Sequence, residues 1–270
     1  MADKGRSLAQ AVATSLFLLG LVIACYLLGR AAFFVLAAAV ILFAFFELMD
    51  AAPRKGRGPH IVFGLACCFA LMLAAYLHRP DWLLAVAAAT PAGCLLLSLQ
   101  PGHTATAADD AAWTVLGVAW IGGGGAAAVS ILVLPGEGLK LLILFMLAAA
   151  ADDISAYFVG TAFGRHRLAP SISPSKTWEG FAGGVAGALV VAAILIPLWT
   201  TLGVAQALAV GAIVAVLAPL GDLAESLVKR ELGVKDSGRL LPGHGGMLDR
   251  LDAIIFCAPA VFLLLHFMVS

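Results

Sequence analysis

The stretch from residue 222 to residue 252 holds many of the groups in this chain that could do chemistry. The 270-residue sequence has 16 basic and 16 acidic residues, and eleven of these 32 fall within these 31 positions. They are Asp222, Glu225, Lys229, Arg230, Glu231, Lys235, Asp236, Arg239, Asp249, Arg250 and Asp252. Charges beside apolar segments are costly unless they face a polar cavity or a ligand, so the stretch indicates a functional site.

The acids of this stretch come in pairs at helical spacing. Asp222 and Glu225 are three residues apart near the end of an apolar run. Asp249 and Asp252 repeat that spacing where the last apolar run begins. Each pair can therefore project from one helix face. Four cations lie between the pairs: Lys229, Arg230, Lys235 and Arg239.

This order of residue types suits phosphates bound with a metal. Mg2+ takes one or two carboxylates and completes its shell with phosphate oxygens and water. The alternative is a solvated cytoplasmic loop that only sets membrane topology, which needs cations but no paired acids. The turn Pro242 to Gly246 leads into the last apolar run, and amides in such a turn bind anions. Within it, His244 would donate a hydrogen bond to phosphate or transfer a proton.

A second set of polar residues lies upstream. Asp152 and Asp153 interrupt the apolar stretch LLILFMLAAAADDISAYF, where a carboxylate must face water or a cation. Lys176 precedes Thr177, which we expect to cap a helix that has Glu179 in its first turn. We interpret Lys176 as a phosphate ligand. The alternative is a lysine that serves only topology.

The run from Ser226 to Asp252 resembles the signature of the phosphatidate cytidylyltransferases, also called CDP-diacylglycerol synthases. It contains the pattern S-x-x-K-R-x4-K-D-x4-[LI]-P-G-H-G-G-x-x-D-R-x-D with no departure at a charged position. Asp153 before Ala-Tyr and the run SPSKTWEG, 173–180, resemble the same family. Asp152 departs from it, since the family has a small or neutral polar residue there. The resemblance covers residues 139–269, and the first half shares only an apolar, multi-helix character.

The resemblance implies an enzyme that joins CTP and phosphatidic acid into CDP-diacylglycerol and releases pyrophosphate. Catalytic roles fall to Asp153, Lys176, Asp222, Lys229, Arg230 and Asp249. Substrate binding falls to Glu225, Ser226, Lys235, Asp236, Gly243, His244, Gly245, Gly246, Arg250 and Asp252. Asp222 and Asp249, with Asp153, would hold Mg2+. A second cation and a homodimer stay open, and no basic tract indicates nucleic acid.

Composition assigns the class independently. Hydrophobic residues make up 62% of the chain, charged residues 12%, and the mean hydropathy is +1.03, whereas ordinary globular chains carry about a quarter charged residues. We predict an all-α polytopic integral membrane protein with a scaffold of transmembrane helices over 1–135 and a catalytic part over 136–270. Nine apolar runs are long enough to span a bilayer: 8–29, 31–49, 60–77, 82–99, 112–134, 139–163, 178–200, 204–228 and 249–269.

Charge asymmetry predicts the orientation. With nine spans and a cytoplasmic N-terminus, thirteen Lys and Arg residues fall inside and three outside, in agreement with the positive-inside rule. The charged loops 164–177 and 229–248 then share the cytoplasmic side, where nucleotide is available. Eight spans would also place the two loops on one side, but would move the N-terminus outside. A prokaryotic inner membrane is the expected location.

Other enzyme and transporter functions could explain part of this pattern of charged residues. A related lipid nucleotidyltransferase, or a polyprenol or lipid kinase, would use the same groups and differ in its products. An ion-coupled transporter could explain acids within the membrane, but it would predict repeated halves, and the sequence has no such repeat.

Four local features carry structural predictions. Gly180, Gly183, Gly184 and Gly187 form a small-residue helix face for close packing. Residues 164–180 are expected to form a loop that leads into a helix. The glycines at 122–125 are expected to break or bend a helix. Glu47, inside the second apolar run, is expected to reach toward the membrane surface from a helix end. The alternative is that it lines the cavity for the lipid.

Overall fold

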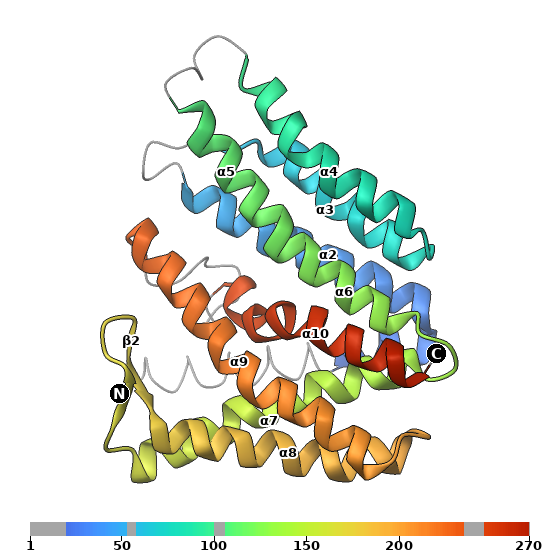
Figure 1. The fold of residues 1–270 in the computed structure, drawn as a ribbon, viewed down its shortest axis with the longest axis vertical. Helices are drawn as coiled ribbons and strands as arrows, with labels where there is room; N and C mark the ends of the chain where they lie inside the picture. The colour runs from blue at the N-terminus through green and yellow to red at the C-terminus, as the bar shows by residue number, and fades with distance from the viewer. Residues whose placement is uncertain (1–19, 53–57, 100–105, 235–245, 270) are drawn as a thin grey trace. The chain divides into compact units, whose positions relative to one another are not determined.

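The computed structural model describes residues 20–52, 58–99, 106–234 and 246–269, and it is almost entirely helical (Figure 1). The elements are α2 (Arg30–Ala51), α3 (Ile61–Tyr76), α4 (Pro80–Leu97), α5 (Ala107–Gly117), the π-helical turn η2 (Val118–Gly122), α6 (Gly123–Leu132), α7 (Gly138–Phe163), β1 (Arg167–Ala169), β2 (Ser173–Thr177), α8 (Trp178–Trp199), α9 (Val204–Leu232), the 3-10 turn η3 (Leu248–Arg250) and α10 (Asp252–Val269). They group into two units. Unit 1 extends to Val129 and includes Leu232–Leu251, and unit 2 holds Ser130–Glu231 and the residues from Asp252 onward.

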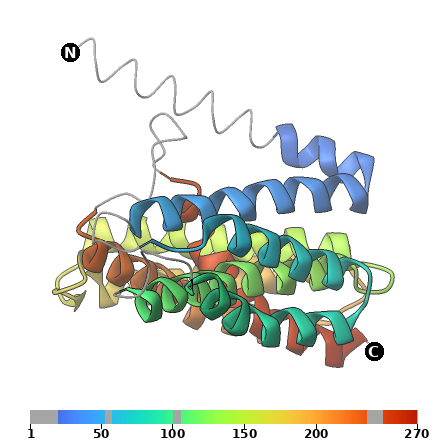
Figure 2. The same ribbon diagram turned by 90° about the horizontal axis from the view of Figure 1, so that it is seen from above.

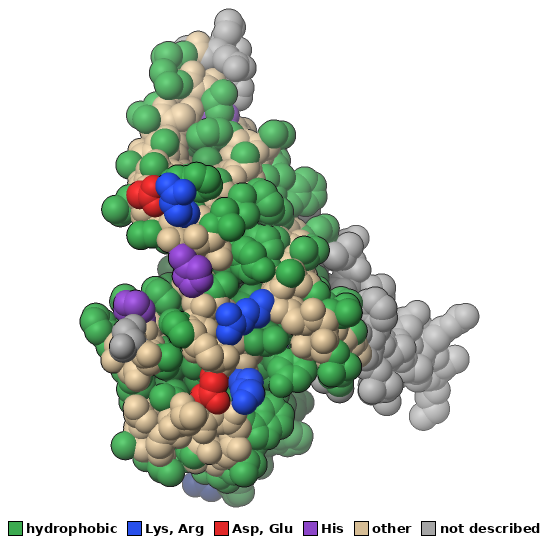
Figure 3. All heavy atoms as spheres, turned by 90° about the vertical axis from the view of Figure 1, so that its right-hand side faces the viewer, with side chains coloured by type: hydrophobic (Ala, Val, Ile, Leu, Met, Phe, Trp, Pro, Cys, Tyr) green, Lys and Arg blue, Asp and Glu red, His purple; other side chains and the backbone are tan. Residues whose placement is uncertain are grey.

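The membrane class predicted from composition agrees with these helices. Seven helices among the described residues are long and apolar enough to cross a bilayer, and α3 is apolar but only 16 residues long. Many large apolar side chains are exposed, including Leu27, Val62 and Phe267 at 77%, 83% and 81%, and hydrophobic side chains cover most of the face in Figure 3. Such exposure suits a lipid environment. The chain is thus an integral membrane protein, while the count of nine spans stays a prediction because 8–29 lies largely outside the described residues.

The helices of unit 1 pack closely at glycines. A Cβ on Gly122 would lie 2.8 Å from the Cys68 sulfur, and one on Gly125 would lie 2.9 Å from the Ile41 side chain. These contacts join η2 to α3 and α6 to α2. Figure 2 shows the ribbon of the chain, with these helices, from above. Of the expected break or bend at glycines 122–125, the break is not found: a π-helical turn ends at Gly122 and the helix continues through α6. The surrounding contacts offset the low helix propensity of glycine.

A buried polar cluster in unit 1 connects α5 to the start of α3. The fully buried Asp110 accepts hydrogen bonds from the Gly58 N–H at 2.5 Å and from the Thr106 hydroxyl at 2.8 Å. The hydroxyl of Thr114, one turn further, accepts the N–H of His60 at 2.9 Å. Because amides at a helix start lack intrahelical acceptors, these side chains take the place of a conventional cap.

In unit 2, α7 and α8 pack along the predicted small-residue face (Figure 1). A Cβ on Gly180 would lie 2.9 Å from the Ala156 carbonyl oxygen, and one on Gly187 would lie 2.8 Å from that of Ala151. A Cβ on Gly184 would lie 2.8 Å from the Asp152 carboxylate. The packing role of these glycines is confirmed, and it is typical of membrane helices, whose association depends on close approach.

We predict that Gly187→Val destabilises the α7–α8 pair. The added side chain would meet a backbone carbonyl, which cannot rotate away, so we expect a cost of about 1–3 kcal/mol. Thermal unfolding of the protein in detergent measures it as a lower midpoint. Ala186→Val, at the exposed neighbouring position, is the matched control and should leave the midpoint near that of wild type. Equal midpoints for the two variants would contradict the packing argument.

The structure also differs from the prediction of a plain loop at residues 164–180. The expected loop contains a two-stranded antiparallel sheet in which Arg167 faces Thr177 and Ala169 faces Ser173. Pro174 hid this strand from sequence reasoning, yet proline is tolerated where a strand has a free edge. The predicted cap is confirmed, because the Thr177 hydroxyl accepts the Gly180 N–H at 3.1 Å and α8 begins at the next residue.

Glu137, just before α7, connects the start of that helix to the turn before α9. Its carboxylate accepts the N–H of Thr201 at 2.8 Å and lies 3.5 Å from the Lys140 ammonium group. The Thr201 N–H stabilises the ionised form and holds the pKa of Glu137 below its ordinary value. The following helix, α9, ends where Gly233 adopts a left-handed conformation with φ of 71°.

Candidate functional site

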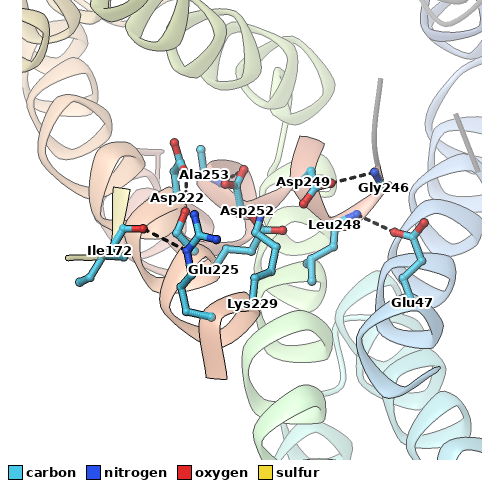
Figure 4. A network of polar contacts seen from close by, with 12 residues as sticks. Glu47, Ile172, Asp222, Glu225, Lys229, Gly246, Leu248, Asp249, Asp252 and Ala253 are labelled. Atoms are coloured by element: carbon cyan, nitrogen blue, oxygen red, sulfur yellow. Dashed lines mark hydrogen bonds and ion pairs between the residues drawn. The ribbon is translucent and has the colours of Figure 1, made fainter. Parts of the chain in front are cut away.

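Three carboxylates of unit 2 converge at the centre of the candidate site (Figure 4). Asp222 and Glu225 come from α9, and Asp252 is the first residue of α10. Ligand oxygens of the three lie within 4.8 Å of one another. Glu225 is 1% exposed and Asp252 is 7% exposed, whereas Asp222 is half-buried. Grouping three acids away from bulk water is unfavourable unless cations compensate their charge.

Local sequence explains why these acids meet. Asp222 and Glu225 share a face of α9 because they are three residues apart. Gly221 permits the approach of α10, since a Cβ there would lie 2.8 Å from the Phe256 Cβ and 2.9 Å from the Asp252 carbonyl oxygen. The Asp252 side chain accepts the N–H of Ala253 at 2.8 Å, as suits an acid at a helix start.

Two lysines supply compensating charge. The Lys176 ammonium group lies 2.6 Å from Asp222 Oδ2 and donates to the Pro219 carbonyl oxygen at 3.3 Å. The Lys229 ammonium group lies 2.7 Å from Glu225 Oε2. Asp222 Oδ1 also accepts a hydrogen bond from the Ser226 hydroxyl at 3.3 Å. Two cations that the sequence assigned to phosphate are thus paired with the site's acids.

The β1–β2 hairpin is attached to α9 at two points. Lys176 on β2 makes the contact with Asp222, and Arg230 Nε donates to the carbonyl oxygen of Ile172 at 3.5 Å. At the other end of the hairpin, Glu179 accepts the backbone N–H groups of Arg165 and His166, and the His166 ring lies 2.6 Å from its carboxylate. The hairpin therefore holds Lys176 beside the acidic cluster.

The two neighbouring acids of α7, Asp152 and Asp153, lie in different surroundings. Asp153, predicted as a metal ligand, is exposed and lies outside the three-acid group, but its charge interacts with that of Asp252. Asp152 is 1% exposed and faces Gly184 of α8. Adjacent helical positions point in different directions, so one acid faces the helix contact while the other is exposed.

Asp249 and its neighbours belong to unit 1. The carboxylate of Asp249, in η3, accepts the Gly246 N–H at 2.8 Å, so one amide that the sequence assigned to phosphate is engaged within the turn. Arg250 is exposed at the end of η3. The other predicted residues of this loop lie outside the described residues: Lys235, Asp236, Gly243, His244 and Gly245.

The structure contradicts the sequence prediction that Glu47 is a helix-end residue with an exposed carboxylate. Its side chain is not exposed at the helix end: it is 5% exposed, and its Oε2 accepts the N–H of Met247 at 2.6 Å and of Leu248 at 3.1 Å. Figure 4 shows this side chain on α2 reaching the backbone of η3. The only sequence signal was a lone acid within an apolar run, because its partners lie 200 residues away in the chain.

The donors of the three-acid cluster match a hard divalent cation. Asp222, Glu225 and Asp252 offer carboxylate oxygens, without the sulfur and imidazole ligands typical of zinc and copper. Mg2+ is the cation of this class that works together with phosphates. The residues are therefore of the type that Mg2+ takes. Of the three metal ligands expected from the sequence, Asp222, Asp153 and Asp249, this group contains Asp222, and its other members are Glu225 and Asp252.

Fold and site together define a class of protein: a helical integral membrane protein with a carboxylate cluster beside lysines, suited to phosphates and a metal ion. Within that class, the chain belongs to the cytidylyltransferase family, because residues 9–268 match the family's sequence profile.

Individual relatives support this assignment. The chain is 45% identical over 132 residues to the uncharacterized protein YnbB of Escherichia coli K12, a match that covers 48% of this chain and 44% of that protein. It is 43% identical over 140 residues to a phosphatidate cytidylyltransferase of Mycobacterium bovis, covering 50% and 44%. For the phosphatidate cytidylyltransferase of Brucella abortus the identity is 36% over 175 residues, covering 64% and 62%. The chain spans about half the length of the first two relatives.

Proposed function

We propose that this protein is a phosphatidate cytidylyltransferase, which transfers CMP from CTP to phosphatidic acid and forms CDP-diacylglycerol and pyrophosphate. The observation that carries the proposal is the cluster of Asp222 with the buried Glu225 and Asp252, and with Lys176 and Lys229 against it. Membership of the cytidylyltransferase family and relatives that bear this enzyme's name support the substrates.

The reaction needs little from the protein beyond position and charge. A phosphate oxygen of the lipid attacks the α-phosphorus of CTP, and the bond to the oxygen shared with the β-phosphorus breaks, so pyrophosphate leaves with the electron pair. The lipid phosphate is already anionic at neutral pH and needs no general base. Alignment and neutralisation of the phosphates therefore account for the catalysis.

Each group of the cluster has a role in this proposal. Asp222, Glu225 and Asp252 would hold Mg2+, which when bound offsets the charge of the phosphate oxygens. The ammonium groups of Lys176 and Lys229 now face carboxylates, and they would turn to phosphates once a cation neutralises those acids. For Arg230 and Asp249 we keep the catalytic roles that the resemblance to the family implies, with Asp249 as a further metal ligand.

The environment is part of the proposal. We place the site at the cytoplasmic face of a bacterial inner membrane, with nine spans and a cytoplasmic N-terminus. The excess of Lys and Arg in the inner segments and the bacterial relatives support this placement. The number of cations and the formation of a homodimer stay predictions.

The test is a product assay with purified full-length protein in detergent. CTP labelled in the cytosine ring, phosphatidic acid and Mg2+ should yield a labelled, CMP-bearing lipid and one pyrophosphate for each lipid formed. Omission of phosphatidic acid is the control and should leave no label in the lipid extract. Formation of CDP without a labelled lipid would contradict the proposal and indicate a kinase.

A further inference from the structure

Glu47 is a buried acid that the proposed reaction does not use. It lies on α2 at 5% exposure, in a span whose mean hydropathy is 2.5. A carboxylate in such surroundings is costly unless it is hydrogen-bonded. Its contacts within unit 1 indicate what compensates this cost.

The partners of Glu47 are backbone groups of the signature. One oxygen, Oε2, accepts both the Met247 N–H at 2.6 Å and the Leu248 N–H at 3.1 Å. These residues lie between Gly246 and Asp249, and those two are joined by a hydrogen bond of 2.8 Å. The carboxylate of Asp249 is also close enough to interact with the charge of Glu47. Glu47 thus fixes the backbone from which Asp249 projects.

We propose that Glu47 is a positioning residue, which anchors the η3 backbone and thereby orients Asp249 toward its ligand. The inference rests on the proposed function for the role of Asp249, but the anchor itself is a structural statement. It is tested by two independent measurements, of amide exchange and of activity.

Three substitutions separate anchoring from charge. Because a single oxygen accepts both amides, Glu47→Gln can keep an acceptor at the same place without the charge. Glu47→Asp keeps the charge but is one methylene shorter, and Glu47→Ala removes both. Asp50→Asn is the matched control, since this exposed acid lies on the same helix.

The first measurement is hydrogen–deuterium exchange of the full-length protein in detergent, without substrates. We expect the amides of residues 247–248 to exchange about tenfold or more faster in the Ala and Asp variants. They should stay near wild type in the Gln variant and in the Asp50 control. Unchanged exchange in the Ala variant would overturn the anchor. Should the Ala variant fail to fold, the comparison of Asp with Gln decides the question.

The second measurement is CTP-dependent lipid labelling. Loss of an outer-shell partner typically costs 10- to 100-fold, so we expect kcat to fall at least about tenfold in the Ala and Asp variants. The KM for phosphatidic acid should change little, and the Gln variant should retain most of the wild-type kcat. Faster exchange with wild-type kcat, or a Gln variant as impaired as Ala, would overturn the positioning role. A wild-type protein that labels no lipid would refute the proposed function instead, while the exchange result still tests the anchor.

Discussion

Asp222→Asn should abolish most of the activity while the protein stays folded. The amide oxygen that replaces Oδ1 or Oδ2 can still accept from Ser226 or Lys176, so the local hydrogen bonds survive in part. The negative charge offered to the cation is lost. We expect kcat/KM to fall about a hundredfold or more, with a higher Mg2+ concentration for half-maximal rate.

The same reasoning applies to the other two acids of the cluster. Glu225→Gln and Asp252→Asn should act in the same direction, because the three side chains share one group of oxygens. Glu231→Gln is the matched control, since this exposed acid lies on the same helix, α9. Initial rates over a Mg2+ titration provide the measurement. An Asp222→Asn protein with wild-type rates at every Mg2+ concentration would remove the metal role assigned to the cluster.

Lys176→Met should also reduce activity strongly, by about a hundredfold in kcat/KM for CTP. Two effects combine: the phosphates lose a cation, and Asp222 loses the ammonium group 2.6 Å away. Lys176→Arg keeps the charge with a different shape and should lose less. Arg167→Met on the neighbouring strand is the control for loss of an exposed cation and should leave the rate nearly unchanged.

A double mutant separates the two effects of Lys176. If its only role is to pair with Asp222, Lys176→Met should add nothing to the loss already caused by Asp222→Asn. If it also contacts the phosphates, the double variant should be slower than either single variant, and its KM for CTP should be higher than that of Asp222→Asn. Wild-type rates for Lys176→Met would instead support the alternative from the sequence, in which Lys176 serves only membrane topology.

The described part of the chain shows how far sequence reasoning reached in the fold. Apolar run length predicted the helices well: the run 139–163 became Gly138–Phe163 and 178–200 became Trp178–Trp199. Spacing of small residues predicted the packing face of α8. The β1–β2 hairpin was missed because its strands are only three and five residues long and β2 contains a proline, so they show no alternating apolar pattern.

In the candidate site, too, the sequence predicted relations within one helix and missed contacts between distant segments. Asp222 and Glu225 were paired correctly from their spacing, because both lie on one helix. Asp252 enters the group through the close approach of α10 at Gly221, which no local pattern reveals. Glu47 was misinterpreted for a similar reason, because its amide partners are remote in the chain.

What the sequence determined by itself is class and local pattern: a membrane protein of the cytidylyltransferase family with acids at helical spacing. These properties depend on composition and on short repeats, which the chain carries locally. Tertiary structure alone decided that Asp252 joins Asp222 and Glu225, that Lys176 pairs with Asp222, and that Glu47 bonds to the backbone of η3. Those contacts join residues up to 201 positions apart, and only the packing of helices brings such residues within hydrogen-bonding distance.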